Sequence, residues 1–387
     1  MSLSILADEN MPFALEAFST LGDVRLMSGR KMSPADVRGA DLLVVRSITK
    51  VNEALLAGSR VRFVGTATIG TDHVDLPYLE RRGIAFSAAP GCNANSVSEW
   101  FAGSLLEMAA RKGFSLEGKS LGIVGVGNVG SRVEQKALAL GMKVVRNDPP
   151  LAEKTGDPKY RPLEEALAAN VVTMHVPLEK GGRHPTFHLA GRAFFERLGR
   201  GKGFVNAGRG ASVDEPALRD ALRQGRLLFS VLDVFEGEPA ISAETVLLAD
   251  LVSPHVAGYS FEGKVNGTSQ IYAAACRHLG ATPSWDPASV LGEKRSLPFA
   301  PTGNLLADLL AVVRSSHDVR DDDRDLRAAV GSPEPGPAFD ALRKNYRKRR
   351  EFSNTMVRIL KPDARLAAIL RALGFGVEEP AAGGRAP

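Results

Sequence analysis

Short apolar runs alternate with amphipathic segments through the first 98 residues of the chain. Runs of this kind predict buried strands, and segments with a helical period predict helices that cover a sheet. The predicted strands are 3–7, 24–26, 41–45, 61–64 and 85–87, and a predicted helix spans 12–21. Because strands that alternate with helices form parallel sheets, we expect an α/β domain here.

The same alternation continues in the middle of the chain, after a helical segment over 98–110. Further strands are predicted at 121–124, 143–146, 171–175, 204–206, 229–232 and 251–252, with a helix over 133–140. A second doubly wound parallel sheet is therefore expected. A helical segment from about 262 to 279 is expected to return to the first domain.

The pattern changes near residue 282, where prolines and charged residues become frequent. Helices are predicted over 305–313, 339–349 and 363–373, and a strand over 356–360. These elements are too few to bury a core alone, so we expect them to pack on a partner subunit or on the first domain. The expected domains are 1–98 with 257–281, 99–256 and 282–380, followed by a disordered tail over 381–387.

Composition narrows the class of protein. No apolar run approaches the roughly 20 residues needed to cross a bilayer, so no membrane partner is expected. Cys92 and Cys276 are too few for a disulfide framework or a zinc cage, which favours a reducing cytosol and no metal site. The net charge of +5 suits a small anionic substrate. We interpret the basic run 343–350 first as a solvated helix face, then as a phosphate or subunit contact, and last as a nucleic-acid contact.

The most informative motif is the GxGxxG that ends the strand over 121–124, with Gly125, Gly127 and Gly130. Such glycines permit a tight turn, close approach to a pyrophosphate and close packing of the next helix. Asp148, eighteen positions after Gly130, is placed to bind a ribose hydroxyl and to repel a 2′-phosphate. The motif therefore predicts NAD as cofactor. The positive charge of Arg146, two residues before Asp148, would weaken the discrimination against NADP. A chance glycine-rich turn is the alternative.

Three predicted strand ends in the second sheet carry residues suited to oxidising an alcohol beside a carboxylate. Arg209 would offer two parallel donors to the carboxylate. His255 would take the hydroxyl proton, and Glu238 would hold the imidazole. Taken alone, each has a structural alternative: an arginine bound to loop carbonyls, a surface histidine and a solvated acid.

In the first domain, Arg46 and Ser47 follow one predicted strand, and Thr66 and Thr68 follow another. A cation and hydroxyls at sheet ends would suit a phosphorylated hydroxy acid. Turn formation and helix capping are the alternative roles.

The order of GxGxxG, Asn206-Ala-Gly-Arg-Gly, Asp233-Val-Phe-Glu-Gly-Glu-Pro and Ser253-Pro-His resembles the D-isomer-specific 2-hydroxyacid dehydrogenase family. The resemblance implies a Rossmann-type NAD domain, a flavodoxin-like substrate domain and a small α+β C-terminal dimerisation domain. It implies catalytic roles for Arg209, Glu238 and His255, and substrate contacts from Arg46, Ser47, Thr68 and Tyr259. The implied cofactor contacts are Gly125, Gly127, Asn128, Val129, Gly130, Asp148, Val176, Ala207, Gly208, Asp233 and Gly258. Gly208 departs from the family, which often has a bulkier residue there, and is expected to loosen the Arg209 loop.

Motifs outside this shared set span nearly the whole chain, among them 7–12, 45–52, 63–75 and 255–264. Within the family they resemble members that oxidise 4-phospho-D-erythronate at its 2-hydroxyl to 2-oxo-3-hydroxy-4-phosphobutanoate. The resemblance further implies a cytoplasmic homodimer that serves pyridoxal 5′-phosphate biosynthesis. A 3-phosphoglycerate or glyoxylate/hydroxypyruvate enzyme is the nearest alternative, and a non-catalytic NAD-sensing protein is a more distant one.

Overall fold

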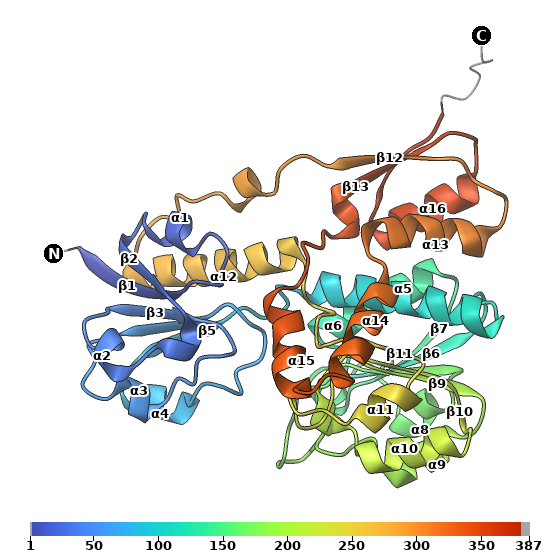
Figure 1. The fold of residues 1–387 in the computed structure, drawn as a ribbon, viewed down its shortest axis with the longest axis horizontal. Coiled ribbons are helices and arrows are strands. Elements are labelled where there is room, and N and C mark those ends of the chain that lie inside the picture. The colour runs from blue at the N-terminus through green and yellow to red at the C-terminus, as the bar shows by residue number, and fades with distance from the viewer. Residues whose placement is uncertain (1, 381–387) are drawn as a thin grey trace. The chain divides into compact units, whose positions relative to one another are not determined.

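The computed structural model describes residues 2–380, so the tail expected over 381–387 lies outside the described residues. The described chain forms two compact units, 2–93 with 260–293 and 94–259 with 294–380 (Figure 1). Both are built on parallel sheets, and the expected α/β fold class is confirmed. The finer division into three domains stays a prediction, because 294–380 belongs to the same unit as the glycine motif.

The first unit has one five-stranded sheet in the order β2-β1-β3-β4-β5. This is the flavodoxin-like order. Neighbouring residues of a strand pack on opposite faces: Ile5 joins one buried cluster and Leu6 the other. The strands are β1 (Leu3–Asp8), β2 (Gly22–Met27), β3 (Leu42–Val45), β4 (Phe63–Thr66) and β5 (Ala85–Ala88), and the helices are α1 (Ala14–Phe18), α2 (Pro34–Val37), α3 (Glu53–Leu56), α4 (Leu76–Arg81) and α12 (Phe261–Leu279), with short 3₁₀ turns at Gly29–Lys31 and Pro287–Val290.

Helix α12 lies against this sheet because β4 offers it a glycine. A Cβ added at Gly65 would lie 2.3 Å from Ile271, so only glycine permits this approach. The helix begins at Ser260, whose hydroxyl accepts a hydrogen bond from the Gly263 amide, and it ends at Gly280 in the left-handed conformation. These signals explain why its predicted span agrees closely with the structure.

The second unit is built on a six-stranded parallel sheet in the order β11-β10-β9-β8-β6-β7. The order reverses between β6 and β8, and open α/β sheets bind ligands at such a switch point, beyond the carboxyl ends of the strands. The strands are β6 (Ser120–Val124), β7 (Lys143–Asn147), β8 (Val171–Met174), β9 (Lys202–Asn206), β10 (Leu227–Leu232) and β11 (Leu251–Val252). The helices around them are α5 (Ala94–Lys112), α6 (Asn128–Ala139), α7 (Pro149–Thr155), α8 (Leu163–Leu167), α9 (Arg192–Leu198), α10 (Glu215–Arg223) and α11 (Ala243–Leu248), with a 3₁₀ turn at Gly210–Ser212.

The C-terminal part of this unit contains a three-stranded parallel sheet, β12-β13-β14, where the sequence predicted one strand. Its elements are β12 (Arg295–Phe299), α13 (Leu305–Ser316), α14 (Val319–Val330), α15 (Pro335–Lys344), β13 (Thr355–Ile359), α16 (Ala364–Leu373) and β14 (Gly376–Glu378), with a 3₁₀ turn at Phe352–Asn354.

The C-terminal part has a packing partner that the sequence did not predict, and its expected packing on a partner subunit or on the first domain stays a prediction. Its helices α13 and α16 pack on α5 and α6 of the same unit (Figure 1). Val313 and Leu370 share one buried cluster with Leu105 and Val133. These contacts help to bury α5 on nearly every side, with its large apolar residues Trp100, Phe101 and Leu105 inside.

The interpretation of 343–350 as a solvated helix face is wrong. Helix α15 ends at Lys344, before most of the run. Arg349 is 3% exposed and donates hydrogen bonds to the carbonyl oxygens of Ala257 and Ser96. The guanidinium of Arg347 pairs with Asp322. Over residues 2–380, no helix is long and apolar enough to cross a membrane.

Candidate active site

The glycine loop after β6 has the shape that a dinucleotide requires. Gly125 has φ +89°, and a Cβ there would lie 2.9 Å from the backbone of His175. A Cβ at Gly130 would lie 2.1 Å from the carbonyl oxygen of Gly125, whereas one at Gly127 would meet nothing within 4 Å. The outer two glycines thus serve the fold. The middle one leaves open space at the amino end of α6, where a pyrophosphate would approach the first-turn residues Asn128 and Val129.

Asp148 lies where the cofactor's ribose is expected. It follows β7, and its Oδ2 accepts a hydrogen bond of 2.8 Å from the amide of Val126 in the glycine loop. Its Oδ1 caps α7 through the Leu151 amide. Arg146 does not soften this acidic position, because its guanidinium forms a two-pronged pair with Glu134. The geometry therefore fits NAD.

The loop before Arg209 is firmly packed, so the flexibility expected from Gly208 is wrong. The Asn206 side chain accepts a hydrogen bond from the Gly208 amide and donates one to the Arg209 carbonyl oxygen. A Cβ at Gly208 would lie 3.0 Å from the carbonyl oxygen of Val176, which follows β8. Because of this close approach, Val176 and the segment 207–208 form one surface at the switch point.

The structure brings His255 and Glu238 together. The imidazole Nδ1 lies 2.7 Å from the Glu238 carboxylate, so Nε2 is the nitrogen left for a substrate. Burial alone would raise the pKa of Glu238, but His255 and the Phe235 amide outweigh it, and the pKa lies below its ordinary value. Glu238 therefore stays ionised and can stabilise an imidazolium.

Asp233 holds the turn that presents His255. Its buried Oδ1 accepts hydrogen bonds from the Ser253 hydroxyl and from the amides of Val256 and Ala257. His255 itself has φ +57°, a left-handed conformation that is uncommon for a residue with a side chain. Local strain of this kind is typical of functional sites.

The loops that carry Arg209 and Glu238 touch. A Cβ at Gly210 would lie 1.9 Å from the carbonyl oxygen of Phe235, so the two loops meet backbone to backbone. Arg209, Glu238 and His255 thus come from three adjacent strand ends of one sheet, which is what acid–base chemistry beside a carboxylate requires.

In the first unit, the expected substrate residues follow two neighbouring strands. Arg46 and the exposed Ser47 follow β3, and Thr68 follows β4 with its hydroxyl bonded to Thr66 and to the Gly70 carbonyl oxygen. No sequence motif assigns a role to Lys264 of α12. Burial, reinforced by the charge of Arg46, lowers the pKa of Lys264 to about 8. The positive charges of Lys264 and Arg46 repel each other, and a bound anion would relieve this repulsion.

Arg343 of α15 is a second cation that the sequence reasoning missed. Its Nη2 lies 3.4 Å from the hydroxyl of Tyr259, four residues beyond His255. The two residues are 84 positions apart, so no local motif announces the contact.

The chain is similar to known proteins over nearly its whole length. The model of the D-isomer specific 2-hydroxyacid dehydrogenase NAD binding domain matches residues 93–257, and that of a domain of unknown function matches 297–374. An erythronate-4-phosphate dehydrogenase of Serratia proteamaculans is 45% identical over 96% of this chain and 99% of its own. One from Escherichia fergusonii is 45% identical over 98% and 100%.

The chain belongs to the erythronate-4-phosphate dehydrogenase family. Among solved structures, D-lactate dehydrogenase of Aquifex aeolicus, crystallised with NAD and lactic acid, is 27% identical with a TM-score of 0.59. It covers 71% of this chain and 95% of its own length.

Proposed function

We propose that the chain oxidises 4-phospho-D-erythronate at its 2-hydroxyl to 2-oxo-3-hydroxy-4-phosphobutanoate, in pyridoxal 5′-phosphate biosynthesis. The observation that carries the proposal is the 2.7 Å contact between His255 and Glu238, in a loop adjacent to that of Arg209. Similarity to family members over almost the full chain supports the choice of substrate.

The residues of the second unit have separate roles in the proposed reaction. Nε2 of His255 takes the proton of the 2-hydroxyl, while Glu238 stabilises the imidazolium that forms. The Arg209 guanidinium orients the carboxylate and stabilises the carbonyl oxygen that develops at C2. When bound, NAD supplies the acceptor for the hydride that leaves C2. Asp148, the glycine loop, Val176, Ala207, Gly208 and Gly258 are the proposed residues that hold it.

Asp233 is better assigned to the loop than to the cofactor, since its Oδ1 binds the turn around His255. Ser47, Thr68 and Arg46 stay proposed substrate contacts, together with Tyr259. We further propose a homodimer formed through 282–380, supported by the exposed Leu360, which directly follows β13. The free thiols of Cys92 and Cys276 support a reducing cytosol as its location.

Steady-state rates on a panel of acids test the proposal. The purified protein is supplied with NAD and either 4-phospho-D-erythronate, 3-phospho-D-glycerate or D-glycerate, and product is measured by NADH absorbance and mass spectrometry. We expect the highest kcat/KM with 4-phospho-D-erythronate. A preference for D-glycerate would contradict the proposed substrate, and no product from any acid would contradict the activity. Native mass spectrometry of the same sample is expected to show two subunits.

A further inference from the structure

The C-terminal chain places a guanidinium beside the catalytic loop. The Cζ of Arg343 lies 6.0 Å from the centre of the Tyr259 ring, and Nη2 reaches the phenol oxygen of the same residue. The guanidinium also lies 5.8 Å from the centre of the ring of Phe339, one turn earlier in α15. Arg343 thus lies against two aromatic rings and is only partly exposed.

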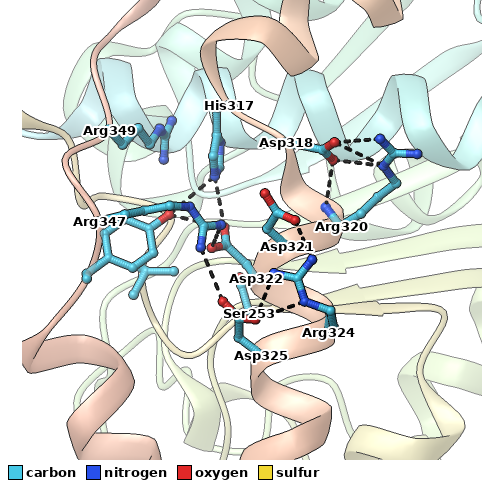
Figure 2. A network of polar contacts seen from close by, with 12 residues as sticks. Ser253, His317, Asp318, Arg320, Asp321, Asp322, Arg324, Asp325, Arg347 and Arg349 are labelled. Atoms are coloured by element: carbon cyan, nitrogen blue, oxygen red, sulfur yellow. Dashed lines mark hydrogen bonds and ion pairs between the residues drawn. The ribbon is translucent and has the colours of Figure 1, made fainter.

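A polar network holds this part of the chain in place (Figure 2). The buried His317 and Asp322 lie 2.8 Å apart, and the hydroxyl of Tyr346 donates to the same Asp322 carboxylate. The Tyr346 ring in turn meets Tyr259 edge to face, with ring centres 5.8 Å apart. Tyr259 therefore contacts both Arg343 and Tyr346, which lie three residues apart in the chain. Tyr346 is itself held by its hydrogen bond to Asp322.

The same guanidinium interacts electrostatically with Glu238, the partner of His255. Helix α15 begins against the Glu238 loop, where a Cβ at Gly336 would lie 3.7 Å from the Pro239 carbonyl oxygen. Burial opposes the charged form of Arg343, but Tyr259 and Glu238 outweigh it and raise its pKa. The residue therefore carries a full positive charge beside the catalytic acid–base pair.

Arg343 has hydrogen-bonding capacity to spare. A guanidinium has five N–H donors, and the contact with Tyr259 uses one of them. Its Nε is buried and has no hydrogen-bond partner among the described residues. A buried donor without a partner is costly, so such a group is expected to meet a ligand.

We propose that Arg343 binds the phosphate group of the substrate and thereby selects phosphorylated hydroxy acids. This inference rests on the proposed function. If Arg209 takes the carboxylate at one end of the four-carbon substrate, the dianion at the opposite end needs a second cation, and Arg343 lies beside Tyr259, a proposed substrate contact. A planar guanidinium suits that dianion, because it can offer two parallel donors to a phosphate monoester.

The experiment compares 4-phospho-D-erythronate with D-erythronate, which lacks the phosphate, in the unchanged protein and in Arg343→Gln. We expect the variant to raise KM for the phosphorylated acid about 10- to 100-fold, as the loss of a charged hydrogen bond would. The kcat/KM for D-erythronate should change less than about threefold, since that acid has no group for Arg343. Lys344→Gln, which removes the neighbouring exposed positive charge, is the matched control and should leave both values unchanged.

An unchanged KM for the phosphorylated acid, or an equal loss of kcat/KM with both acids, would overturn the inference. If Arg343→Gln does not fold, as judged by thermal unfolding, Arg343→Lys replaces it and inorganic phosphate serves as a competitive inhibitor. Its inhibition constant should then rise relative to the unchanged protein, and an unaltered constant would again overturn the inference. If the unchanged protein fails to oxidise 4-phospho-D-erythronate, the proposed function itself is contradicted. If it oxidises this acid but Arg343→Gln has no selective effect, only the role of Arg343 is contradicted.

Discussion

Single residues decide the chemistry of the second unit, and His255 is the clearest of them. The buried Asp233 holds the turn around His255, whose backbone has a left-handed conformation that is uncommon for a residue with a side chain. Such support indicates that the orientation of the imidazole matters for function, because a solvated histidine does not need it.

Replacing His255 by Asn is therefore expected to remove proton transfer and little else. We predict a fall in kcat of about 10²- to 10⁴-fold with 4-phospho-D-erythronate. The affinity for NADH, measured by fluorescence titration, should stay within about twofold, since the glycine loop is untouched. A fall in kcat of less than about tenfold would remove His255 from the proposed role.

Residues named by a local motif could be predicted from the sequence, and residues brought in from afar could not. Arg209, Glu238 and His255 each follow a strand, and parallel strands end at one edge of a sheet. Arg343 reaches Tyr259 from a separate helix, 84 positions further along the chain. Only the packed structure shows that it turns inward.

The glycine loop shows at the level of an element which positions serve the fold and which serve a ligand. A Cβ would meet different surroundings at Gly130 and at Gly127, so alanine substitutions at the two positions should have different effects. Gly130→Ala would collide with the Gly125 carbonyl oxygen and should lower the melting temperature of the protein without ligand. Gly127→Ala meets open space, so it should melt like the unchanged protein but bind NADH at least about tenfold more weakly. Equal NADH affinity in Gly127→Ala and the unchanged protein would argue against this placement of the cofactor.

Helix α5 carries a buried carboxylate whose protonation links it to the C-terminal chain. Both oxygens of Glu99 accept the Phe352 amide at 3.0 Å, and the Asn95 amide bridges Glu99 to Glu351. Burial, with the charge of Glu351 added, raises the pKa of Glu99 from 4.5 to about 8. Between these values the folded protein holds a proton that the unfolded chain has released.

Stability is therefore predicted to fall as pH rises from about 5 to 8, because the folded state binds more protons than the unfolded state in this window. One proton corresponds to a slope of up to about 1.4 kcal/mol per pH unit. Glu99→Gln, which has no proton to lose, should flatten the slope in urea unfolding measured across the window. Parallel pH dependence in the variant and the unchanged protein would show that Glu99 ionises normally.

Elements with a clear apolar period were predicted, and elements held by polar contacts were missed. The spans of α12 and β11 agree with the sequence pattern because caps and apolar runs mark them. Helix α14 escaped notice because most of its residues are charged and its few apolar ones, such as Leu326, face the sheet cluster of 94–259. Its position depends on polar partners such as Asp323, which accepts the Val252 amide.

For the whole molecule, the C-terminal chain is part of the second unit's core rather than an appendage. Leu309, Phe352 and Leu370 lie in the same buried cluster as Trp100 and Ile123. Ending the chain after residue 293 would strip α5 and α6 of this cover, so we predict that the truncated protein is insoluble when produced beside the full chain. A soluble truncated protein with unaltered NADH affinity would show that the shared core is dispensable.

The most direct test of the proposed chemistry follows a single atom. The protein is given NAD and 4-phospho-D-erythronate carrying deuterium at C2, and the reduced nucleotide is recovered after denaturation and weighed by mass spectrometry. We predict that it carries one deuterium, because hydride leaves C2 while His255 takes the hydroxyl proton. Reduced nucleotide without deuterium would contradict oxidation at this carbon.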